Sequence, residues 1–240
     1  MHKTEARGAS GKVAAADGPA KFYAEIANGL HAMAQPLTIL RAAMEVLALP
    51  PSAGVDQQRY REISAAQLER TCDVFAKVQD LVSARYVEAD RNHYDLWAVI
   101  APLIEDHRNV LQASGVGLAA ARSGPWEPIV GDARRTEHAV AALLHIAGDL
   151  AIRGDVIEVS GSPASGFLEL TIEITRKHSR AMNSSARLSL ALAKENILSQ
   201  HGNYELTEDP FRVTLALPVV DLGSVRNEAS FNRPITEPVH

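Results

Sequence analysis

The feature that most constrains the fold of this chain is a repeat of apolar residues that begins near residue 21. Spacings of three and four residues separate its members, which are Tyr23, Ile26, Leu30, Met33, Leu37, Leu40, Met44 and Leu47. A repeat of this kind, sustained over residues 23–47, is typical of a long helix packed side by side with other helices. The run ends at a Pro-Pro-Ser-Ala-Gly segment, residues 50–54, which predicts a sharp break.

A second helical run follows this break and spans residues 56–86. Its apolar stripe comprises Ser64, Leu68, Thr71, Phe75, Val78 and Val82, with Val74 and Leu81 on its flank. Two long helices joined by a short Pro/Gly segment predict an antiparallel helical hairpin. One hairpin cannot cover its own seam, so we expect two copies to form a homodimer with a four-helix bundle. The alternative is that the hairpin packs against the rest of its own chain.

After residue 90 the sequence changes to a mixture of helical and strand patterns. Helices are predicted at 96–111, 132–152 and 186–201, and strands at 116–121, 127–130, 156–160, 167–175, 204–206 and 211–217. The segment 161–166 is predicted to be a hairpin loop. The elements predict an α+β sandwich, a mostly antiparallel sheet with helices on one face. The chain thus divides into a flexible arm (1–17), a helical hairpin (18–88), a sandwich (89–218) and a tail (219–240).

Composition excludes several classes of partner. The formal net charge is −5, so no basic excess exists to neutralise the phosphates of a nucleic acid. No apolar run approaches the roughly 18–20 residues of a membrane span, so no membrane partner is expected. Cys72 is the only cysteine, which rules out an intrachain disulfide and favours a reducing, cytoplasmic location.

The candidate chemistry lies in the first helix, around His31, Gln35 and Pro36. His31 is rotated about 100° from Leu30 of the seam, so its imidazole is expected to face solvent. Pro36 lacks a backbone N–H and is expected to loosen or kink the helix beside the histidine. An exposed imidazole beside a kink can act as a nucleophile toward phosphorus. Taken alone, however, an exposed histidine on a helix is most often merely solvated.

The pattern His31-x-x-x-Gln35-Pro36-Leu37, with Arg41 after it, resembles the phosphoacceptor box of sensor histidine kinases. The order of elements from about residue 18 to residue 218 is similar to that family too. The resemblance implies a dimerisation and phosphotransfer hairpin followed by a histidine-kinase-type ATPase α/β sandwich. The resemblance implies that His31 is the phosphoacceptor.

Two shorter motifs carry the resemblance into the second half of the chain. Gly131-Asp132-x-x-Arg135 resembles the entry to the family's nucleotide helix, and His201-Gly202 resembles the end of its last helix. Asp132 is also a preferred residue type for the N-cap of a helix. His138 and His145 share one face of this helix at a spacing compatible with a metal pair, but no third ligand is evident, and no metal site is expected.

The sequence departs from the family wherever the family handles ATP. The acidic residue expected after the histidine is Ala32, and the two asparagines expected on the nucleotide helix are Ala142 and Ile146. The Asp-x-Gly-x-Gly motif is replaced by Thr175-Arg176-Lys177-His178-Ser179, and the glycine-rich box by Arg187-Leu188-Ser189-Leu190. Without these groups the backbone cannot approach phosphates, and Mg²⁺ lacks hard oxygen ligands. The ATPase-type sandwich is therefore interpreted as degenerate, and neither ATP nor any other cofactor is expected.

The retained histidine then predicts a phosphorelay protein of two-component systems. We expect a histidine phosphotransferase that carries a phosphoryl group on His31 between response-regulator receiver domains, with Mg²⁺ supplied only by the receiver. One alternative is a pseudokinase that acts as a scaffold or inhibitor of signalling partners; another is a divergent active histidine kinase. A third is an aspartyl-phosphate phosphatase in which Gln35, one turn from His31, orients a water or the phosphoryl group.

Overall fold

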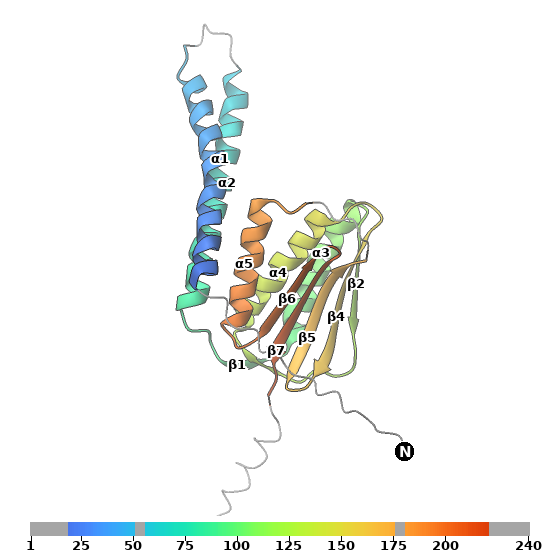
Figure 1. Ribbon diagram of the computed structural model, residues 1–240. Coiled ribbons are helices and arrows are strands. Elements are labelled where there is room, and N and C mark those ends of the chain that lie inside the picture. The colour runs from blue at the N-terminus through green and yellow to red at the C-terminus, as the bar shows by residue number, and fades with distance from the viewer. Residues whose placement is uncertain (1–18, 51–55, 176–180, 221–240) are drawn as a thin grey trace, which may run out of the picture.

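The computed structural model describes residues 19–50, 56–175 and 181–220 (Figure 1). Its helices are α1 (Pro19–Leu47), α2 (Gln57–Tyr86), α3 (Leu96–Ala113), α4 (Ala133–Leu150) and α5 (Ser184–Leu198). Its strands are β1 (Asn92–Tyr94), β2 (Gly117–Arg122), β3 (Ile129–Gly131), β4 (Val156–Ala164), β5 (Phe167–Ile174), β6 (Asn203–Glu208) and β7 (Phe211–Pro218). The predicted arm (1–17) and most of the predicted tail lie outside the described residues.

The helical hairpin has the predicted two helices, but its buried face is shifted by one residue along α1. The buried positions of α1 recur every seven residues and are Phe22, Gly29, Pro36 and Ala43. The row that begins one residue later, at Tyr23, is exposed, and Leu30 within it is 53% exposed. A single hairpin thus leaves Leu30 of the predicted seam uncovered, and its burial against a second copy stays a prediction.

Small side chains explain this shift. A Cβ placed on Gly29 would lie 2.6 Å from Cγ2 of Val78, a distance that real Cβ atoms essentially never show. The two helices therefore pack closely at this glycine, and Ala43 is buried on the same face of α1. Close packing is thus set by where small residues allow contact, while the larger apolar row remains outside.

The sandwich contains a five-stranded sheet in the order β2-β4-β5-β7-β6, in which only the β2–β4 pairing is parallel. Helices α3, α4 and α5 cover one face of this sheet (Figure 1). Leu168, Leu170, Ile172 and Ile174 of β5 are all buried, as their alternation predicts. The predicted α+β sandwich with a mostly antiparallel sheet is confirmed.

Three local features differ from the sequence-based predictions. Strand β4 continues to Ala164, so the predicted six-residue loop shrinks to a tight turn whose Gly166 has a φ of 75°. Strand β1 was not predicted, because three residues paired only with β3 leave too short a pattern. Val219 and Val220, the first two residues of the predicted tail (219–240), pack on the sandwich, because Val219 bridges Ile129 and Val220 is buried.

Helix α5 and one arginine attach the sandwich to the hairpin. Leu188 of α5 is 1% exposed and belongs to the core of the hairpin with Val74, Val78 and Leu81. Arg135, at the start of α4, donates hydrogen bonds of 2.8–3.3 Å to the carbonyl oxygens of three residues at and beyond the end of α2, Ala84, Val87 and Glu88. Carbonyl groups at the C-terminus of a helix lack partners within the helix, so the half-buried guanidinium of Arg135 is well suited to satisfy them. Within the described ranges, no helix is long and apolar enough to cross a membrane.

Replacement of Arg135 should weaken the whole chain. We expect Arg135→Met to lower the free energy of unfolding by about 2–4 kcal/mol, because it removes the charged partner of the Ala84 carbonyl, the Ser199 hydroxyl and the Asp132 carboxylate, all partly buried. Urea denaturation followed by circular dichroism measures this change. Arg134→Met is the matched control, because Arg134 is the exposed neighbour in the same helical turn. Equal stability of the two variants would contradict the role assigned to Arg135.

Candidate functional site

His31 lies exposed in the middle of α1, on a different side of the helix from the buried face. Helix α1 continues through Pro36, which is itself buried. Because proline has no N–H, the carbonyl of Ala32, next to His31, receives no hydrogen bond from position 36. Thr38, in the following turn, donates its hydroxyl to the carbonyl of Ala34 at 2.8 Å. Helix α1 therefore continues past Pro36 with one backbone hydrogen bond fewer beside the histidine.

The imidazole borders a cavity of 340 Å³ between the hairpin and the beginning of α5. Arg70 of α2 lines the cavity opposite α1, and Asn183 to Ser185 line it from α5. Asn183 is the N-cap of α5, and its side-chain oxygen accepts a hydrogen bond from the N–H of Ala186 at 2.8 Å. A guanidinium and the positive end of a helix dipole therefore lie on the same cavity as His31, and both favour negative charge there.

Gln35 is exposed one turn along α1 from His31 and lines the same cavity. The structure thus brings together the two polar side chains of the predicted phosphoacceptor box. Arg70, Asn183 and Ser185 were not predicted for this site. Nothing in the local sequence signals them, because they come from other helices and reach His31 only through the packing of α5 on the hairpin.

The positions that would handle ATP in a histidine kinase have structural roles here. Ile146, which aligns with a metal-binding asparagine, is 1% exposed and belongs to the main core. Leu188, within the stretch that aligns with the glycine-rich box, fills the core of the hairpin. Neither residue offers an oxygen ligand or a bare backbone to a nucleotide, so the side chains present do not fit ATP and Mg²⁺ in the manner of the family.

A hydrogen-bond network occupies the beginning of α4. Asp132 is the N-cap, as predicted, and accepts from the N–H groups of Arg134 and Arg135 at 3.0 and 3.1 Å. The N–H of Asp132 donates to the side-chain oxygen of Gln200 at 2.7 Å. Tyr94 and Thr136 are hydrogen-bonded through their hydroxyls at 2.7 Å, and burial raises the pKa of Tyr94 to about 12. These hydrogen bonds hold the beginning of α4 in place.

One of the two histidines that share one face of α4 lies near a carboxylate. His138 and His145 are exposed, and His145 lies 3.7 Å from the carboxylate of Asp149. Across the described part of the chain, no group of three or more His, Cys, Asp or Glu side chains is arranged to hold a metal ion.

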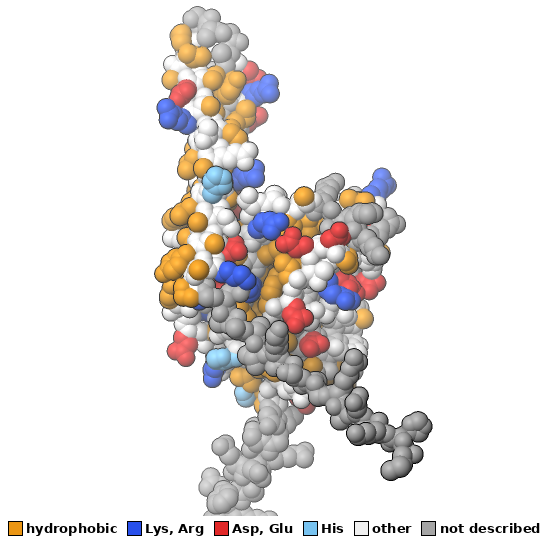
Figure 2. Space-filling view, in the orientation of Figure 1, with side chains coloured by type: hydrophobic (Ala, Val, Ile, Leu, Met, Phe, Trp, Pro, Cys, Tyr) orange, Lys and Arg blue, Asp and Glu red, His pale blue; other side chains and the backbone are white. Residues whose placement is uncertain are grey.

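The hairpin also exposes two apolar rows, each with a seven-residue repeat. Row one, on α1, consists of Tyr23, Leu30, Leu37 and Met44, and row two, on α2, consists of Leu68, Phe75 and Val82. Their side chains are 37–61% exposed. Figure 2 shows hydrophobic side chains gathered along the outer edge of the hairpin, away from the sandwich. Exposed apolar side chains at this spacing are typical of helices that pack against another chain.

Comparison with solved structures identifies the fold. The histidine kinase AdeS of Acinetobacter baumannii superposes with a TM-score of 0.63 at 17% identity, over 80% of this chain and 98% of that chain. Full-length ShkA, in complex with AMPPNP, gives a TM-score of 0.56 at 13% identity, over 85% of this chain and 47% of that chain. No protein-family model and no curated protein sequence matches the chain. The chain therefore has the fold of sensor histidine kinases, a helical hairpin followed by an ATPase-type α/β sandwich.

Truncation of Leu188 should measure how strongly α5 is attached to the hairpin. We expect Leu188→Ala to lower the free energy of unfolding by about 2–5 kcal/mol, because it leaves a cavity in the hairpin core. Chemical denaturation of full-length protein measures the loss. Val110→Ala serves as the control, since Val110 is 70% exposed on α3, and it should change stability by less than about 0.5 kcal/mol. If Leu188→Ala lowers the free energy of unfolding as little as the control does, the assignment of Leu188 to the core is wrong.

Proposed function

We propose that this protein is a histidine phosphotransferase of two-component signalling that works without ATP. His31 accepts a phosphoryl group from the phosphoaspartate of one response-regulator receiver domain and passes it to the aspartate of another. The observation that supports this proposal is a difference between the phosphoacceptor position and the positions that serve ATP in kinases. The phosphoacceptor histidine remains exposed beside a cavity, whereas Ile146 and Leu188, at positions that serve ATP in kinases, are core residues.

The transfer needs little from this chain besides a positioned imidazole. A ring nitrogen of neutral His31 attacks phosphorus, the N–P bond forms, and the acyl-phosphate P–O bond breaks to release the receiver's aspartate as a carboxylate. The proton on the other ring nitrogen is then lost to water, and the second receiver reverses these steps. The charge of the phosphoryl group in transit is complemented by Arg70 and by the N-terminus of α5, both of which border the cavity.

Two features of the site support exchange with a receiver rather than with the chain's own sandwich. Ala32 follows His31, so the chain lacks the neighbouring acid that takes the proton in kinases of this family. A receiver that brings its own aspartate and Mg²⁺ makes that acid dispensable. Docking on the exposed side of α1, which carries His31 and Gln35, would bring the two reacting groups together.

The alternative function for the same site is binding of partner proteins without chemistry. In that case the protein is a pseudokinase that holds receivers or other kinases, and His31 takes no part in chemistry. Ala32 is the residue that favours this alternative. Gln35, one turn from His31, would orient a water if the protein instead removed phosphate from a receiver.

We further propose that the protein is a homodimer. Row one and row two are the two exposed apolar rows of the hairpin, and their seven-residue repeat suits the seam of a four-helix bundle made from two hairpins. Such a dimer would bury both rows while His31, on another side of α1, remains accessible.

The phosphotransfer proposal predicts phosphohistidine formation at one residue. Purified protein incubated with a radiolabelled, phosphorylated receiver and Mg²⁺ should acquire acid-labile label, and His31→Ala should abolish it. His138→Ala, at an exposed histidine of α4, should label like the wild type. Labelled ATP in place of the phosphorylated receiver should give no phosphohistidine.

The same assay separates the alternatives. Receiver binding without label, unaffected by His31→Ala, would favour the scaffold. Release of inorganic phosphate that depends on Gln35 and not on His31 would favour the phosphatase. Self-labelling from ATP would overturn the proposal and make the protein an active kinase.

The dimer proposal predicts that charge in the exposed rows separates the subunits. Leu30→Glu combined with Phe75→Glu places carboxylates in the seam, where burial without partners is costly. Light scattering should report about twice the 25.9 kDa chain mass for the wild type and the single chain mass for the variant. The control variant Val110→Glu introduces a carboxylate at an exposed position of α3, and this variant should remain dimeric. A wild-type mass near one chain would rule out the four-helix bundle.

A further inference from the structure

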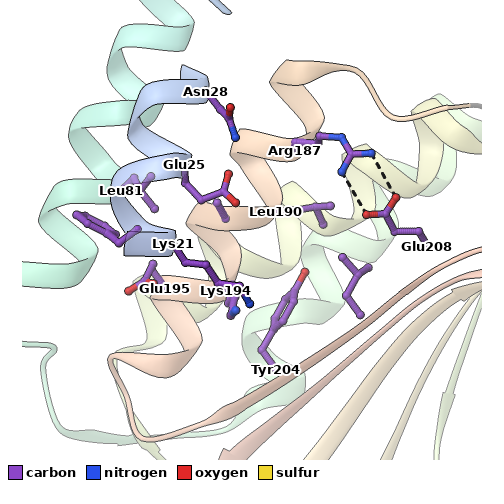
Figure 3. Close-up of a pocket in the computed structure, with 13 residues that line it drawn as sticks. Lys21, Glu25, Asn28, Leu81, Arg187, Leu190, Lys194, Glu195, Tyr204 and Glu208 are labelled. Carbon is purple, nitrogen blue, oxygen red and sulfur yellow. Dashed lines mark hydrogen bonds and ion pairs between the residues drawn. The ribbon is translucent and has the colours of Figure 1, made fainter. Parts of the chain in front are cut away.

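Two cavities that border α5 differ in the charge of their lining. One lies between the beginning of α1, α5 and β6 (Figure 3). Its lining carries positive and negative side chains in equal number, Lys21, Arg187 and Lys194 with Glu25, Glu195 and Glu208. Figure 3 shows the ion pair of Arg187 with Glu208, at 3.3 Å. The charge of this cavity therefore favours neither an anion nor a cation.

The other is the cavity of 340 Å³ at His31, which has no such balance. Among the described residues that line it, His31 and Arg70 are the ionisable ones, so none of these residues is a carboxylate that would repel an anion. Arg70 forms no hydrogen bond or ion pair with another residue in the described part of the chain. The lining therefore complements a small anion held beside the imidazole.

Neutral hydrogen-bond donors complete the lining of this cavity. Gln35, one turn from His31 on α1, offers its amide N–H groups. From α5, the hydroxyl oxygen of Ser185 accepts a hydrogen bond from Nζ of Lys77 at 3.4 Å, so the hydroxyl proton is available to a ligand. Lys77 is itself paired with Asp73 at 2.9 Å, so this contact adds a donor without adding net charge.

We propose that a small acyl phosphate binds in this cavity and donates its phosphoryl group to His31 directly. The inference rests on the proposed function, because it uses the same phosphoacceptor, and it adds a second class of donor. The phosphoaspartate of a receiver is itself an acyl phosphate, so the same type of bond is broken. The volume of the cavity lies within the range of small-molecule sites, so a small donor needs no receiver around it.

The phosphoryl group moves from oxygen to nitrogen in this step. A ring nitrogen of neutral His31 attacks phosphorus and forms the N–P bond, while the bond between phosphorus and the bridging oxygen breaks and the leaving group departs as a carboxylate. The proton on the other ring nitrogen is lost to water. Arg70 complements the charge of the phosphoryl oxygens, and Gln35 and Ser185 donate hydrogen bonds to them. Loading of His31 in this way supplies phosphoryl groups to a receiver without a phosphorylated protein donor.

Acetyl phosphate is the probe for this site. Full-length protein incubated with acetyl phosphate that is radiolabelled at phosphorus should acquire acid-labile label, at a rate that saturates with acetyl phosphate concentration. His31→Ala should abolish the label. Acetyl phosphate radiolabelled in the acetyl group should give none, because His31 attacks phosphorus and not the carbonyl carbon.

Arg70→Met should lower the rate of labelling by acetyl phosphate at least about tenfold, because the phosphoryl oxygens lose their charged donor. Arg59→Met is the matched control and should keep the wild-type rate, since Arg59 is exposed on the same face of α2 about three turns away. Circular dichroism of both variants checks that they are folded. A rate that rises linearly with acetyl phosphate, equal rates in the two variants, or label from the acetyl group would each overturn the proposal.

A parallel incubation with a phosphorylated receiver separates this proposal from the proposed function. Label from the receiver but none from acetyl phosphate would overturn the small donor and leave phosphotransfer between receivers intact. Label from neither donor would overturn both. Saturable label from acetyl phosphate alone would support the cavity as a small-donor site and contradict transfer from receivers.

Discussion

The packing of Leu188 into the hairpin core is the contact on which the rest of this structure depends. It lies against Val74 and Val78 of α2, close to Gly29 of α1, and so joins the sandwich to both helices of the hairpin. In a histidine kinase the corresponding stretch is glycine-rich and must leave room for phosphates. Here a buried leucine fills that space with apolar contacts, which stabilise the packing of the sandwich on the hairpin. No flexible glycine backbone is then left at this position for a nucleotide.

This contact also explains the position of the candidate site. The beginning of α5 is held next to the middle of α1, so the N-cap Asn183 and the serines after it border the cavity at His31. Arg135 strengthens the arrangement at the other end of the hairpin, where it satisfies the last carbonyl groups of α2. The sandwich thus borders the cavity at His31 through the beginning of α5, and its packing on the hairpin sets that position.

The sequence predicted the positions of the helices and strands better than the side of each helix that is buried. The hairpin, the sandwich and the N-cap Asp132 follow from local patterns, because helix periodicity and capping depend on neighbours in the chain. The sequence did not distinguish the face of α1 that packs within the chain from row one, because Leu30 and the rest of row one are more apolar than Gly29. Periodicity detects apolar side chains, but it does not show where a glycine permits close packing. Arg70 and Asn183 could not be predicted at the site, since only the tertiary packing of α5 brings them near His31.

The division of α1 into separate sides has a consequence for how the length of this helix can vary. One side packs within the chain, row one faces outward, and His31 occupies a third side. Insertion of a single residue after His31 would turn everything beyond it by about 100°, so that row one would continue on a different side and Pro36 would leave the core. Only gains or losses of whole heptads preserve all three sides at once. Homologous chains should therefore differ in α1 by multiples of seven residues, even where their sandwiches differ freely in loop length.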